Sequence, residues 1–284
     1  MSRVSFVVMG GVIVVMATLG AFVAAPGVEP PKAMAIDSRG TLTGRFVVKD
    51  VDKDDLEARN KRQLEVMKSK DEFKPCHQNA NAEELNDQGW VIGADNGLAN
   101  VVVWLAPPAD CYYKLTEDDL DPEKGRWQKE KVLDQPHCAF MPHVMTLFSF
   151  YKEGGKDKAT GQTVTVKNSA VMDHNTKIEA LGFNSLLGAG KNEKMPGVKP
   201  NSKPYQVNCN IHSWMSAYIW SFDHPFAAVT DKDGKFEIKN APAGIELRLM
   251  CWHESMGDKP KEKKVTIEKG SSKDEGTLEV EYTK

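Results

Sequence analysis

Short runs rich in β-branched and aromatic residues recur along this chain of 284 residues, and turn residues separate them. This spacing is typical of strands and not of helices. Between two runs, Asp231–Gly234 offers the Asp and Gly residues that a tight hairpin turn requires. No period of 20–50 residues repeats, which excludes a solenoid. We therefore expect an all-β fold, with strands at Thr41–Val48, Ala99–Leu105, Val144–Tyr151, Thr163–Lys167, Lys177–Ala180, Tyr205–Asn208, Ala217–Phe222, Phe226–Thr230, Lys235–Lys239, Glu246–Cys251, Lys264–Glu268 and Gly276–Tyr282.

One segment, Lys53–Lys70, is helical in character, because it is rich in Leu, Glu, Lys and Arg and carries only a thin apolar stripe. Such a charged segment is typical of a solvated surface helix, and we assign it no function. Hydrophobic residues make up 40% of the chain and charged residues 27%, as in ordinary globular proteins. The net charge of −3 gives no basic footprint for a nucleic acid.

The N-terminal segment has the pattern of an export signal. Arg3 is the only charged side chain before the apolar run Val4–Ala25, and Ala33–Ala35 reads as an A-x-A cleavage site. The run is also long enough to span a bilayer as a single anchor. Both interpretations of residues 1–35 place the remaining chain outside the cytoplasm, in the periplasm or anchored at its membrane. Paired cysteines can form disulfides there.

Four side chains of metal-ligating type occur in two short segments. Residues 209–215 have the pattern C-x2-H-x2-M, which places Cys209, His212 and Met215 on one tight loop. His174 lies upstream in a separate loop. A thiolate favours Cu(I), imidazoles accept both oxidation states, and a weak axial thioether completes a trigonal copper site. The chain has five cysteines, an odd number, so at least one is not in an internal disulfide.

These two segments resemble the copper site of the cupredoxins, and the short ligand loop is most similar to that of amicyanin. The resemblance covers roughly residues 131–223. It implies one copper ion held by His174, Cys209, His212 and Met215, and a Greek-key β-sandwich around it. It also implies that Asn175 ties the two ligand loops together. Trp214 before the Met, and the long stretch between His174 and Cys209, depart from the family pattern.

Other histidines and cysteines invite a second assignment. In residues 137–143, His143 is the best ligand for a second metal, although a structural role is the alternative. Cys138 reads as one half of a disulfide with Cys76 as its partner. With Cys209 as a copper ligand, however, four cysteines remain, and four cysteines allow three pairings. In residues 252–254, a Trp, a His and a Glu end a predicted strand, and we expect the Trp to pack on the core.

The segments that flank the copper region form a second unit. Gly40–Val48, Gly97–Leu105 and the hairpin at residues 228–238 are followed by the turn Ala241–Gly244. With the middle removed, these pieces resemble the carboxypeptidase regulatory-like, or prealbumin-like, β-sandwich. This resemblance implies a cupredoxin inserted in a second sandwich, with boundaries at residues 1–35 (signal or anchor), 36–130 (first part of the outer sandwich), 131–223 (cupredoxin) and 224–284 (second part).

The expected function is one-electron transfer between redox proteins, by transient contact and without catalysis. The resemblance implies that His212 lies near the surface and is the exit for the electron, and Trp214 and Met215 would form an exposed apolar docking patch. Three alternatives remain open: a copper carrier or store, a copper oxidase or reductase, and a non-catalytic binding module of the cell envelope. An enzyme would need an open coordination position, which only His143 or His137 could offer.

Overall fold

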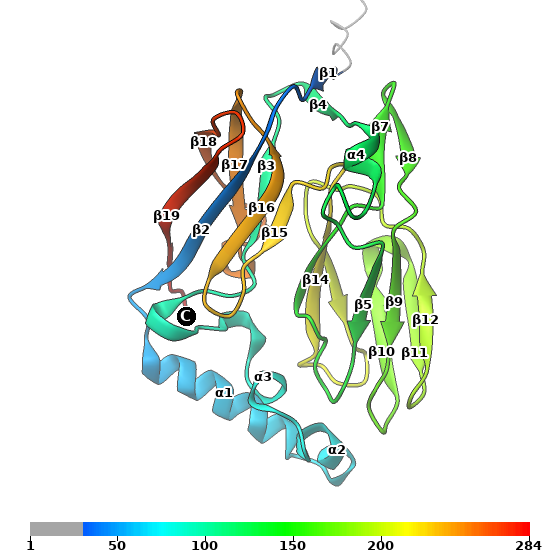
Figure 1. Ribbon diagram of the computed structural model, residues 1–284. Helices are drawn as coiled ribbons and strands as arrows, with labels where there is room; N and C mark the ends of the chain where they lie inside the picture. The colour runs from blue at the N-terminus through cyan, green and yellow to red at the C-terminus, as the bar shows by residue number, and fades with distance from the viewer. Residues whose placement is uncertain (1–30) are drawn as a thin grey trace, which may run out of the picture. The chain divides into compact units, whose positions relative to one another are not determined.

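Four β-sheets of three to five strands dominate residues 31–284, the part of the chain that the computed structural model describes (Figure 1). The all-β prediction is therefore confirmed. The apolar run at residues 4–25 lies outside the described residues. Within residues 31–284, no helix combines the length and the apolar character that crossing a membrane requires.

Strands from both flanks of the chain build two of these sheets. One has the order β16-β2-β19 and the other β15-β3-β17-β18. Their shared core contains Leu42, Phe46, Leu105 and Phe236. The strands are β2 (Arg39–Lys49), β3 (Val102–Ala106), β15 (Ala227–Val229), β16 (Lys235–Pro242), β17 (Glu246–Trp252), β18 (Lys261–Thr266) and β19 (Ser272–Glu281).

Strands from the middle of the chain build the other two sheets, in the orders β11-β10-β13-β14-β6 and β12-β9-β5. A second core lies between them and contains Leu133, Val166, Ile178 and Ile219. The strands are β5 (Glu130–Asp134), β6 (Val144–Leu147), β9 (Thr163–Lys167), β10 (His174–Ile178), β11 (Phe183–Leu187), β12 (Asn192–Met195), β13 (Tyr205–Asn208) and β14 (Ser216–Ser221).

None of these four sheets of residues 31–284 mixes strands of the middle segment with strands of the flanks. This division of strands is what an insertion would produce, while the prealbumin-like family of the flanking sheets stays a prediction. A third core cluster joins the two halves through Trp104 of β3, Trp220 of β14 and Trp252 of β17. The rings of Trp104 and Trp220 lie 4.6 Å apart, and those of Trp220 and Trp252 lie 5.5 Å apart. Trp252 thus packs on the core.

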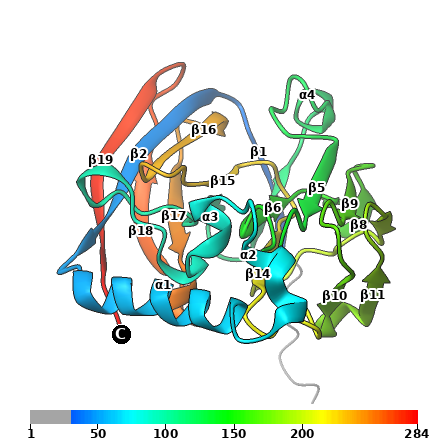
Figure 2. The same ribbon diagram turned by 90° about the horizontal axis from the view of Figure 1, so that it is seen from below.

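A helical excursion separates β2 from β3. It contains α1 (Lys53–Met67), α2 (Lys74–His77), α3 (Ala82–Leu85) and the 3-10 turns Asp71–Phe73, Gln88–Trp90 and Ala94–Asn96. Asp52 caps α1 by accepting a hydrogen bond from the backbone N–H of Asp55. Figures 1 and 2 show α1 to α3 running along one end of the flanking sheets toward one end of the middle sheets.

This excursion is not merely a solvated surface element, which corrects the expectation for Lys53–Lys70. Its residues Met67, Phe73 and Cys76 are buried in the core cluster of the middle sheets. The reason is that the apolar residues gather at and beyond the C-terminal end of α1, where a helical stripe does not show them. We refer to residues 53–90 as the helical cover.

The remaining elements are short: β1 (Lys32–Ala35), β4 (Cys111–Lys114), α4 (Glu117–Leu120), β7 (Phe150–Glu153), β8 (Lys156–Ala159) and the 3-10 turns Glu179–Leu181 and Glu254–Met256. Strand β1 pairs in parallel with β4 through four residues. The expected cleavage site at Ala33–Ala35 lies in this strand, so cleavage after Ala35 would remove it.

Candidate metal centre

Three side chains of the predicted copper site lie together in the structure. The donor atoms of His174, Cys209 and His212 are all within 4.8 Å of one another. Cys209 Sγ is 3.8 Å from Nδ1 of His212, and the rings of the two histidines have centroids 4.8 Å apart. His174 begins β10, while Cys209 and His212 lie between β13 and β14. His174 thus lies in a strand and not in the separate loop that we expected, and this strand end meets a loop 35 residues further along the chain.

The loop between β13 and β14 is closed by its own backbone. The N–H of Cys209 donates to the carbonyl of Met215 at 3.2 Å, and the N–H of Met215 donates to the carbonyl of His212 at 2.9 Å. Met215 is 2% exposed. These bonds hold the cysteine, the histidine and the buried methionine of one short loop in a fixed arrangement.

Asn175 in β10 connects this strand to the ligand loop between β13 and β14. Its Oδ1 accepts a hydrogen bond from the backbone N–H of Asn210 at 3.2 Å, and its Nδ2 donates to Oδ1 of Asn184 and to the carbonyl of Ser185. The residue next to His174 therefore holds the residue next to Cys209.

Burial keeps both imidazoles neutral. Neither His174 nor His212 has exposed surface. Burial, and for His174 also the neighbouring His212, lowers the pKa of each ring to about 4. At neutral pH each ring is then in the unprotonated form, which is the form that binds a metal.

The imidazoles also have unsatisfied nitrogens. Among the described residues, neither nitrogen of His174 and not Nε2 of His212 has a hydrogen-bond partner. Buried polar atoms without partners are costly and rare. A metal ion would satisfy such atoms. Two neutral imidazoles and one cysteine sulfur lie together here, and the same loop carries the buried thioether of Met215. Donors of these kinds suit copper, so these residues fit the ion that the sequence predicts.

The helical cover closes the site from the side at which we expected solvent. The ring of His212 lies 5.4 Å from the ring of Phe73 and 5.1 Å from that of Trp214. Trp214 also donates from Nε1 to the carbonyl of Cys138 at 3.1 Å. The expectation that His212 lies near the surface is therefore wrong, and the expected docking patch fails with it, because Met215 is buried and Trp214 is half-buried.

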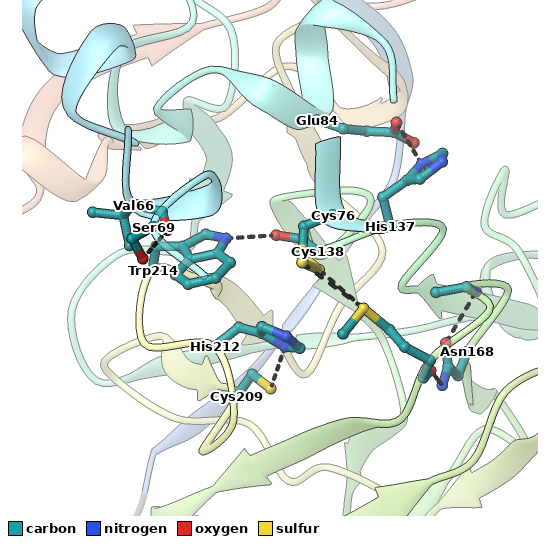
Figure 3. The surroundings of a disulfide bond; sticks show 12 residues. Val66, Ser69, Cys76, Glu84, His137, Cys138, Asn168, Cys209, His212 and Trp214 are labelled. Atoms are coloured by element: carbon teal, nitrogen blue, oxygen red, sulfur yellow. Dashed lines mark hydrogen bonds and ion pairs between the residues drawn. A yellow bond between two sulfur atoms is a disulfide. The ribbon is translucent and has the colours of Figure 1, made fainter. Parts of the chain in front are cut away.

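A disulfide between Cys76 and Cys138 joins the cover to the middle sheets (Figure 3). It lies beside the copper-type site, because its two sulfurs and a nitrogen of His212 are within 4.8 Å of one another. Sequence reasoning proposed the pair but not its position. The one signal was a phenylalanine and a cysteine, Phe73 and Cys76, within an otherwise charged segment.

The second metal site expected at His143 has no free donor in this arrangement. His143 Nδ1 contacts the carbonyl of Ser216 at 3.0 Å, and Nε2 contacts Glu254 at 2.6 Å. Both ring nitrogens are thus engaged. Nearby, Nδ1 of His137 lies 2.8 Å from the carboxylate of Glu84 in the helical cover. Neither His143 nor His137 belongs to a three-donor group among residues 31–284.

No protein-family model matches the chain, and no curated protein matches it. Among solved structures, the Cu-containing nitrite reductase NirK from Thermus scotoductus SA-01 is 19% identical over 33% of this chain and 22% of that chain, with a TM-score of 0.27. Amicyanin from Paracoccus versutus (Thiobacillus versutus) is 13% identical over 33% of this chain and 81% of that chain, with a TM-score of 0.26. A reduced amicyanin variant is 15% identical over 34% of this chain and 84% of that chain, with a TM-score of 0.27. These likenesses concern about a third of this chain.

Proposed function

We propose that this protein binds one copper ion at His174, Cys209, His212 and Met215 and carries single electrons between redox partners. The observation that carries the proposal is the buried group of two neutral histidines and a cysteine, with ring nitrogens that have no partner in the described chain. Copper bound there would supply a couple between Cu(I) and Cu(II).

The surrounding residues hold the donor side chains in place and exclude water from them. Backbone bonds within the ligand loop and the Asn175 bridge fix the donors before any ion arrives. Phe73 and Trp214 keep water from His212. A preformed site of this kind resists a change of geometry, which favours electron transfer over substrate chemistry.

The ligand loop reaches the surface at Ile211, whose side chain is 43% exposed. A redox partner that docks at Ile211 approaches to within one residue of His212. This contact replaces the patch of Trp214 and Met215, and it suits a brief encounter through a small apolar surface.

Three alternatives are less well supported. A copper oxidase or reductase needs an open position for its substrate, whereas the ligands here are buried and His143 is engaged. A carrier that releases copper quickly needs an exchangeable site. A binding module of the cell envelope would use the flanking sheets and would not depend on copper.

We also propose that the chain is exported and stays at the membrane or in the periplasm. The apolar run with a preceding Arg3 supports export. The Cys76–Cys138 disulfide is compatible with an oxidising compartment. The pairing of β1 with β4 favours retention of Lys32–Ala35 in the working protein.

A spectroscopic redox titration tests the proposed function. Residues 31–284 are loaded with one equivalent of Cu(II) and titrated with a mediator series while the visible spectrum is recorded. We expect a reversible transition that fits one electron per chain. Copper that binds but cannot be reduced and reoxidised reversibly would contradict an electron carrier.

A further inference from the structure

A cluster of three sulfur atoms lies beside the proposed copper site. Met172 Sδ is 3.8 Å from Cys76 Sγ and 3.7 Å from Cys138 Sγ. Both cysteines are buried, and Met172 packs against the same core. A nitrogen of His212 completes a group whose cysteine and histidine donors all lie within 4.8 Å of one another. Figure 3 shows His212 between Cys209 on one side and the disulfide on the other.

The spacing of these atoms resembles that of ligands around one metal ion. Ligands bound tetrahedrally at a thiolate distance of about 2.3 Å are separated from each other by about 3.8 Å. The two distances from Met172 have this value. The exception is the pair Cys76 and Cys138, whose sulfurs are bonded to each other and therefore cannot act as thiolates.

We propose that the Cys76–Cys138 disulfide masks a second, Cu(I)-selective site, which goes beyond the electron-transfer function. A dithiol reductant would supply two electrons and two protons, break the S–S bond and leave as its own disulfide. Cu(I) would then displace the two thiol protons and bind to the thiolates of Cys76 and Cys138 and the thioether of Met172. An imidazole nitrogen of His212 is the fourth donor when the first site is empty. Soft sulfur ligands select Cu(I) over harder ions.

The same bond change affects the cover. Cys76 lies in α2, while Cys138 lies in the segment before β6. The disulfide is the covalent link between the helical cover and the middle sheets. Oxidised protein thus holds the cover closed over His212, and reduced protein offers a sulfur-rich place for a second Cu(I).

The test uses a variant in which the first site is disabled and the second is intact, His174→Ala with Cys209→Ser. Its oxidised and dithiol-reduced forms are titrated anaerobically with Cu(I) against a chromophoric Cu(I) chelator. We expect no tightly bound copper in the oxidised form and one equivalent in the reduced form. Cys111 and Cys251 are free thiols in both forms, so the difference reports only the masked pair.

Two further variants in this background sharpen the result. Adding Cys138→Ser should abolish the reduction-dependent equivalent, and adding Met172→Leu should weaken its affinity at least tenfold. Equal copper binding before and after reduction would overturn the proposal. The first site is scored separately, by the visible spectrum of oxidised wild-type protein with Cu(II), so failure of one site is not mistaken for failure of the other.

A second measurement on unmodified protein covers the case in which the variants do not fold. Reduced wild-type protein is alkylated without Cu(I) and with two equivalents of Cu(I), enough to fill both proposed sites, and the modified cysteines are identified by peptide mass. We expect Cu(I) to protect Cys76 and Cys138 together, while Cys111 and Cys251 react equally in both samples. Unprotected Cys76 and Cys138 would contradict the second site.

Discussion

The backbone N–H of Asn210 donates a hydrogen bond to Oδ1 of Asn175 at 3.2 Å, and this bond joins the two segments that carry the proposed copper ligands. Asn175 is 6% exposed, so the bond is shielded from water. Each of the two residues is a neighbour of a proposed ligand, His174 at the start of β10 and Cys209 in the loop before β14. The distance between these two segments therefore depends on the side chain of Asn175.

Replacing Asn175 by Ala should have two effects: it should destabilise the fold, and it should also weaken the hold on copper. Loss of the buried acceptor should lower the free energy of unfolding by about 1–3 kcal/mol. Copper should also dissociate faster, because the two ligand segments are no longer held together. Urea unfolding and the rate of copper transfer to a chelator measure the two effects. Asn184→Ala is the matched control, since it removes one partner of Asn175 but keeps the bond to Asn210. Equal dissociation rates in the two variants would contradict this role.

Shortening Phe73 to Ala should open the site to solvent. Phe73 is 7% exposed and packs against the rings of His212 and Trp214. The substitution should lower the free energy of unfolding by about 3–5 kcal/mol, as for other buried phenylalanines. It should also speed removal of copper by a small chelator. Phe236→Ala, in the core of the flanking sheets, should cost a similar free energy without this increase. A similar increase in both variants would show that the cover does not shield the metal.

The stability of the metal-free protein should fall as the pH falls from about 6.5 to about 4. Burial lowers the pKa of His224 and of His253 to about 4, whereas histidines in an unfolded chain titrate near 6.5. In this pH window each of these histidines binds a proton in the unfolded state but not in the folded state. Each one therefore lowers the free energy of unfolding by about 1.4 kcal/mol per pH unit. Urea unfolding in the presence of a chelator measures the slope. His224→Gln should reduce it, and an unchanged slope would contradict a neutral, buried His224.

The pair of His143 and Glu254 should prove structural. Burial acts to raise the pKa of Glu254, but hydrogen bonds with His143 and Tyr218 outweigh it and lower the pKa. Glu254→Gln should therefore destabilise the protein by about 1–3 kcal/mol and leave the bound Cu(II) unchanged. Glu279→Gln, which removes an exposed partner of Lys49, should cost less than about 1 kcal/mol. Loss of a copper equivalent in Glu254→Gln would instead support a metal at His143.

The sequence predicted the strands whose apolar residues recur, such as β9 and β16, and it placed His174, Cys209 and His212 in one site. It missed β11 and β12, because their exposed faces carry Asn184, Glu193 and Lys194, and a polar run with Gly nearby looks like a loop. Their strand character comes from pairing with other strands, because β11 forms a hairpin with β10 and β12 pairs with β9, which precedes both in the chain.

The position of the helical cover was also beyond sequence reasoning. Its helix α1 buries only Met67, so the hydrophobic pattern indicates a surface element. Contact with the candidate metal centre arises from residues after the helix, Phe73 and Cys76, and from a disulfide to a segment 62 residues away. No local pattern carries such a long-range contact, which is why His212 was expected at the surface.

The visible absorption spectrum of the Cu(II)-loaded protein tests the central claim most directly. If copper binds at His174, Cys209, His212 and Met215, the spectrum contains an intense charge-transfer band from the Cys209 sulfur to the metal. The band should vanish in Cys209→Ser and persist in Cys251→Ser, which removes a free cysteine of the flanking sheets. A pale spectrum, or a band that survives in Cys209→Ser, would contradict copper ligation by this cysteine.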